Sequence, residues 1–87
     1  MNAFTKEAIK VFLEDQMQFF EEKMADTVHE AKEVLEEYMA MELNNIAEVK
    51  EFMKENGMDI AGMSDEEIMD QSEVFPLPSG RFLVIPG

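Results

Sequence analysis

The sequence contains no cysteine and a single histidine, His29. Without cysteine, disulfides and thiolate chemistry are excluded, and a zinc or iron site would lack its usual donors. His29 lies in a segment that we predict to be helical, with no serine near it in the sequence. This argues against a Ser-His-acid catalytic arrangement. We therefore expect no metal, no cofactor and no enzymatic activity.

Positive charge is scarce, with 7 Lys and Arg against 20 Asp and Glu and a formal net charge of −13. So acidic a chain lacks the basic surface that binds phosphate backbones, and anionic membranes would repel it for the same reason. Its electrostatic complement is a basic surface on a partner protein. The amino terminus has neither the basic start nor the apolar core of a signal peptide, so the expected location is the cytoplasm.

Glycine and proline are absent from residues 5–56, which consist largely of good helix formers. At 87 residues the chain is expected to form one domain (1–87), with a helical core at 5–56 and a hairpin tail at 73–87. The predicted fold is an all-α bundle of two or three main helices and one short helix, followed by a C-terminal β-hairpin.

Apolar residues recur in steps of four and three from Leu13 to Met41, a spacing typical of a helix that packs lengthwise on another helix. Asp26 is a competent cap, so a break there, which would give three helices over 5–56, stays open. Because the phase continues past Asp26, the pattern favours one helix of about 37 residues, or roughly 55 Å. A helix that long needs a partner, which favours a homodimer. The predicted oligomer seam consists of Leu13, Met17, Phe20, Met24, Ala31, Val34, Tyr38 and Met41.

Capping patterns divide the rest of the chain. Asn45 followed by Glu48 predicts a helix start, and Gly57 predicts its left-handed end. Ser64 followed by Glu67 predicts a short helix over about 65–71. The apolar tail beyond residue 73 is predicted to form two strands around a turn at 78–80. Its last strand is too apolar to stay exposed, and could pack on the helices, on a second copy or on a partner's sheet edge.

Carboxylates are concentrated in the segment 21–37, on the side of the helix predicted to face water, and few lysines lie four residues away from them to neutralise their charge. Regularly spaced negative charge of this kind could imitate a nucleic-acid backbone. In size and charge the chain is similar to small acidic inhibitors of phages and mobile elements, including anti-restriction and anti-CRISPR proteins. The predicted partner-binding face consists of Glu21, Glu22, Asp26, Glu30, Glu33, Glu36 and Glu37.

The leading hypothesis is therefore a non-enzymatic protein-binding module or inhibitor that engages a basic surface of a partner protein. The alternative is a homo-oligomeric structural or adaptor subunit, in which the nine methionines and the aromatic residues drive assembly and the acidic charge serves only solubility. Exchanging carboxylates of the acidic face for amides should distinguish the two, because only the first hypothesis depends on their charge.

Overall fold

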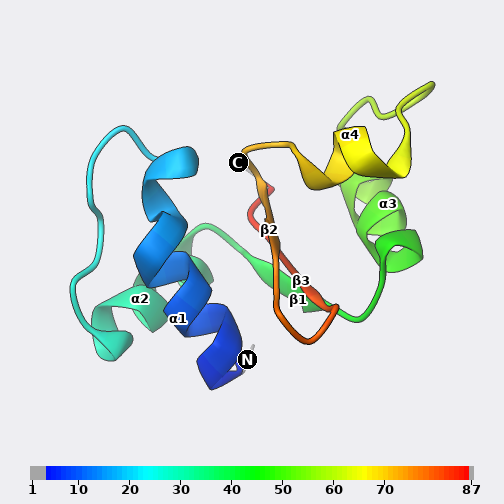
Figure 1. Ribbon diagram of the computed structural model, residues 1–87. Helices are drawn as coiled ribbons and strands as arrows, with labels where there is room; N and C mark the ends of the chain where they lie inside the picture. The colour runs from blue at the N-terminus through cyan, green and yellow to red at the C-terminus, as the bar shows by residue number, and fades with distance from the viewer. Residues whose placement is uncertain (1–3, 87) are drawn as a thin grey trace.

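The computed structural model describes residues 4–86, and within this range four α-helices, one short 3₁₀ helix and three strands follow one another along the chain (Figure 1). In order they are α1 (Lys6–Asp15), η1 (Gln16–Gln18), α2 (Val28–Glu37), β1 (Met41–Leu43), α3 (Ile46–Glu55), α4 (Asp65–Met69), β2 (Val74–Pro76) and β3 (Phe82–Val84). Met1–Ala3 and Gly87 lie outside the described residues.

The strands form one antiparallel sheet in the order β1-β3-β2, so the all-α prediction is wrong and the fold is mixed α/β. β3 pairs with β2 as the predicted C-terminal hairpin, with Phe75 opposite Leu83. It also pairs with β1, a strand that lies inside the segment predicted to be helical, with Glu42 opposite Leu83. Pro76 lies on the edge strand β2, where its missing N–H group costs no ladder hydrogen bond.

The sheet separates two hydrophobic cores, with α1 and α2 on one face and α3 and α4 on the other (Figure 1). Side chains of the central strand alternate between them: Leu83 and Ile85 join the first core, whereas Phe82 and Val84 join the second. A strand buried on both faces reads as a continuous apolar run, which explains the composition of residues 82–85. Of the three possibilities considered for this strand, packing on the helices of its own chain is the one observed.

The favoured long helix is wrong, because the chain leaves α-helical geometry after Asp15, passes through the 3₁₀ helix η1 and re-enters α-helical geometry only at Val28. Gln16 lies at the start of the break. It is buried, and its side-chain amide binds the returning chain. Its Nε2 donates to the carbonyl of Ala25 at 2.9 Å, and its Oε1 accepts from the amide of Met24 at 2.7 Å. The second helix is capped by Thr27, whose hydroxyl accepts from the Glu30 amide, rather than by Asp26.

The caps predicted from local sequence are confirmed. Asn45 accepts from the Glu48 amide and begins α3. Ser64 and Glu67 form a reciprocal capping box at the start of α4. Gly57 has a φ of 77°, the left-handed conformation expected after a helix. These features depend on contacts between residues a few positions apart in the sequence, which is why the sequence predicts them. The helix that precedes α3 ends at Glu37, and Met41, the last residue of the predicted seam, already belongs to β1.

Candidate functional site

The residues of the predicted acidic face are all exposed, and they extend from the η1–α2 connection along α2. Glu21 and Glu22 lie in the connection, and the remaining carboxylates from Glu30 to Glu37 lie on the helix. In projection at 100° per residue, the four helical carboxylates cover one side of α2, away from its buried Ala31 and Leu35. The shortened helix therefore still presents a continuous acidic surface.

Few cations neutralise this surface. Lys23 Nζ lies 2.7 Å from Asp26 Oδ1, and this hydrogen bond, together with the charge of Asp26, raises the pKa of the Lys23 ammonium above its ordinary value. Glu30 accepts from the Asp26 amide in the N-terminal cap of α2. The other carboxylates of the face, Glu21, Glu22, Glu36 and Glu37, form no side-chain hydrogen bond or ion pair within residues 4–86. Their negative charge is left to solvent or a partner.

His29 lies on the exposed side of α2, with Nε2 3.2 Å from Glu33 Oε1. Both side chains are mostly exposed, so the pair occupies no cleft in which a proton could be held away from water. Across the part of the chain that the structure describes, no cluster of His, Cys, Asp or Glu could hold a metal ion. Nor does any buried side-chain nitrogen or oxygen in that part lack a hydrogen-bond partner.

The residues of the predicted oligomer seam do not share one face. Ala31 is buried in the first core, and four others pack against that core inside the chain: Leu13, Phe20, Val34 and Tyr38. Met17 in η1 and Met24 in the η1–α2 connection are 57% and 39% exposed, and Met41 belongs to β1. The two halves of the pattern pack on each other within one chain, so the argument for a dimer from an unpaired helix no longer holds. Dimerisation itself stays a prediction.

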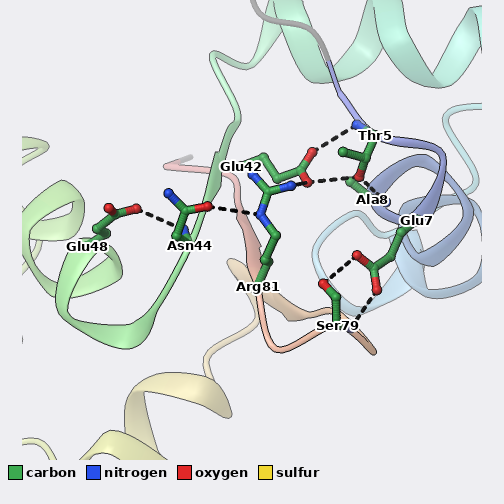
Figure 2. A network of polar contacts seen from close by, with 8 residues as sticks. All are labelled: Thr5, Glu7, Ala8, Glu42, Asn44, Glu48, Ser79 and Arg81. Carbon is green, nitrogen blue, oxygen red and sulfur yellow. Dashed lines mark hydrogen bonds and ion pairs between the residues drawn. The ribbon is translucent and has the colours of Figure 1, made fainter.

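A network of polar contacts ties the start of α1 to the sheet and to the hairpin turn (Figure 2). The Glu42 carboxylate, whose side chain is 5% exposed, lies 2.6 Å from Arg81 Nη1 and also accepts from the Thr5 amide and hydroxyl. Glu7 accepts from the amide and hydroxyl of Ser79, each at 2.6 Å. Both carboxylate oxygens of Glu42 and both of Glu7 thus have hydrogen-bond or ion-pair partners. These two carboxylates therefore have a structural role, and neither is free to act as a base.

A groove of about 600 Å³ lies between α1 and α2, and it was not predicted from the sequence. Its surface is mostly apolar, and three lysines stand among its lining residues. The local sequence shows only that Lys6 and Lys10 lie four residues apart, with Ile9 between them. Lys32 joins the lining of the same groove because α1 and α2 pack together. The lining residues are Phe4, Lys6, Ile9, Lys10, Leu13, Glu14, Val28 and Lys32.

The longest helices of residues 4–86 have ten residues, about half the length needed to cross a bilayer, so none of them is a membrane span. The structure defines the class as a small mixed α/β protein with helices on both faces of a short antiparallel sheet. No protein-family model matches the chain, and no curated protein or solved structure matches it either.

Proposed function

We propose that this protein is a non-enzymatic binding module whose acidic face, from Glu21 to Glu37, engages a basic surface on a partner protein. The observation that carries the proposal is the group of exposed carboxylates without cationic partners on the η1–α2 connection and α2. Such a surface lowers stability through self-repulsion, and a basic partner would relieve that repulsion on binding. The partner is expected to be a protein with a nucleic-acid-binding groove.

The spacing of the carboxylates on α2 supports imitation of a nucleic-acid strand. The helix has ten residues and is therefore about 15 Å long. Its four exposed carboxylates give roughly one negative charge per 4 Å, close to the 3.4 Å that separates charges along one strand of B-DNA. A surface with this charge density would compete with a duplex for a basic groove, as expected of an inhibitor of the anti-restriction or anti-CRISPR type.

The second candidate function, a structural or adaptor subunit, is favoured by apolar side chains that the fold leaves in solvent. Met39 is 73% exposed at a position with a positive φ of 59°, just after α2, and Met17 is 57% exposed. Flexible methionine side chains adapt to varied partner surfaces. In this reading the partner contacts would be apolar, and the affinity would depend little on salt.

The test is affinity capture from the native host with three versions of the chain. The wild type is compared with a triple variant that carries Glu33→Gln, Glu36→Gln and Glu37→Gln. The matched control carries Glu51→Gln, Glu55→Gln and Glu66→Gln, which changes the net charge equally at exposed positions of α3 and α4. If the proposal is right, the α2 variant loses the partner, whereas the control retains it.

Two further measurements on the captured complex separate the candidate functions. For an acidic-face inhibitor, affinity should fall steeply as salt is raised, and duplex DNA should compete for the same partner. Capture that is insensitive to salt and equal for both triple variants would contradict the proposal. Loss of binding on Met39→Ser, with no effect of the Glu exchanges, would instead support the adaptor.

A further inference from the structure

The groove between α1 and α2 is lined by an apolar set of side chains, called its floor, and by a charged set, called its rim, which consists of three lysines and one glutamate, Glu14. Its apolar lining comes from Phe4, Ile9, Leu13 and Val28, and the last of these is 53% exposed. Its volume of about 600 Å³ lies within the usual range for sites that bind small organic ligands. An apolar depression of this size is poorly hydrated and favours an apolar occupant.

The lysines of the rim have no internal explanation. Of the four cations outside the groove, three pair with carboxylates: Lys23 with Asp26, Lys50 with Asp65, and Arg81 with Glu42. Within residues 4–86, four lysines form no ion pair, and three of them, Lys6, Lys10 and Lys32, line this groove. The rim thus has three unpaired ammonium groups against the single carboxylate of Glu14, and this local excess of positive charge, in a chain with 20 acidic residues, can be complemented by an anion from outside.

We propose that the α1–α2 groove binds the carboxylate form of a fatty acid, with its alkyl chain on the apolar floor and its carboxylate beside the lysine ammonium groups. Two properties of the groove correspond to the two parts of this ligand. The floor removes methylene groups from water, which contributes up to about fourfold in affinity for each group that is buried. The lysines supply charge-assisted hydrogen bonds to the head group.

The net charge of −13 determines which kind of apolar anion can bind at the smallest electrostatic cost. An anionic membrane surface or an acidic protein helix would bring many negative charges close to the acidic face of α2, and the repulsion would grow with each of them. A fatty-acid anion brings only one. A free monocarboxylate therefore gains the local attraction of three lysines at the smallest long-range cost. This site is separate from the acidic face and does not rest on the function proposed for it.

The experiment is an isothermal titration of the full chain with dodecanoate, decanoate and octanoate, each below the concentration at which it aggregates. We expect saturable binding of one molecule per chain, weakening several-fold with each pair of methylene groups removed. 1-Decanol, which has the same chain length as decanoate but no charge, should bind on the order of tenfold more weakly. A ¹³C label on the carboxyl carbon should report a shifted, saturating signal in NMR spectra.

Variants with matched controls locate the site. The triple change of Lys6, Lys10 and Lys32 to Gln should weaken dodecanoate binding on the order of tenfold, because exposed charge pairs each contribute modestly. Lys54→Gln alters the fourth unpaired lysine, on α3, and should leave binding unchanged. Val28→Glu should abolish binding by placing a charge in the groove, whereas Met39→Glu, at an exposed apolar residue that does not line this groove, should not.

Several results would overturn the proposal. Equal affinity for decanoate and 1-decanol would mean that the lysines recognise nothing. Unchanged binding in the Lys triple variant, or in Val28→Glu with its circular dichroism spectrum preserved, would place the ligand elsewhere. Absence of saturable binding, together with a dimer in sedimentation velocity that Val28→Glu dissociates, would assign the groove to a second copy of the chain. None of these outcomes affects the capture experiment on the acidic face.

Discussion

The side chain of Gln16 binds both backbone polar groups of Ala25: Nε2 donates to the carbonyl at 2.9 Å, and Oε1 accepts from the amide at 3.0 Å. Both residues are buried, with exposures of 1% and 2%. Nε2 also donates to the carbonyl of Leu13, one of the unpaired carbonyls at the end of α1. One amide thus ends a helix and holds the chain that returns beside it.

Replacement of Gln16 by Leu should lower the free energy of unfolding by about 2 to 4 kcal/mol. The apolar side chain of similar size leaves buried backbone groups of Met24 and Ala25 without partners, and each unsatisfied group costs about 1 to 3 kcal/mol. Urea denaturation followed by circular dichroism measures the change. Gln71→Leu, which removes one exposed hydrogen bond to the Glu67 carbonyl, serves as the control. Equal stability of both variants would show that Gln16 does not hold this connection.

The pair formed by Glu42 and Arg81 should show a coupling of about 1 to 2 kcal/mol in a double-mutant cycle with alanine. Glu42 is nearly buried, so loss of Arg81 leaves its charge with weaker compensation. Thermal or urea unfolding of the two single variants and the double variant supplies the cycle. The same cycle on the exposed pair of Lys23 and Asp26 should give no measurable coupling. A zero result for both pairs would contradict a structural role for the network in Figure 2.

Truncation of the central strand should weaken both cores together. Leu83→Ala opens a cavity in the first core and should cost about 2 to 5 kcal/mol, and Val84→Ala should cost less in the second core because fewer atoms are removed. Since β3 belongs to both, each variant is expected to unfold in one transition with an unchanged dependence on urea. Met39→Ala, at an exposed site, should change stability by less than about 0.5 kcal/mol. Two separate transitions would show that the cores fold independently.

The pKa of Glu67 should be low and should rise when its cap is removed. Hydrogen bonds from the Ser64 amide and hydroxyl hold the pKa of the Glu67 carboxyl below its ordinary value of 4.5. A lowered folded-state pKa means that the capping box stabilises the protein above the unfolded-state pKa, and that this contribution is lost as pH falls through the folded-state pKa. NMR titration of the Glu67 carboxyl should show an upward shift in Ser64→Ala. An unchanged titration would mean that the Ser64 hydroxyl does not contribute to the lowered pKa in solution.

Salt should stabilise the protein, since the net charge of −13 repels itself in the folded state. Raising sodium chloride from about 0.05 M to about 0.5 M shortens the screening length and should increase the free energy of unfolding measured in urea. The Glu33, Glu36 and Glu37 triple exchange to Gln should raise stability at low salt and reduce this dependence. A loss of stability in that variant would mean that these carboxylates stabilise the fold and are not simply a repulsive surface that a partner would neutralise.

Features that depend on neighbours a few residues apart could be predicted from the sequence. The caps at Asn45 and Ser64 and the left-handed Gly57 follow from single side chains meeting the next turn of backbone. The exposure of the acidic face was predictable as well, because unpaired carboxylates are costly to bury. The hairpin was predictable from apolar runs on either side of a turn.

The conformation of the chain between Gln16 and Thr27, and that of β1, depend on contacts between segments far apart in the sequence and could not be predicted from local patterns. Helical propensity and periodicity favour a continuous helix there, but burial of the Gln16 amide against Ala25 outweighs them. Met41 becomes part of a strand because β3, far along the chain, offers unpaired backbone groups beside it. The groove between α1 and α2 exists for the same reason: distant segments must first pack together, and no local pattern records which of them will do so.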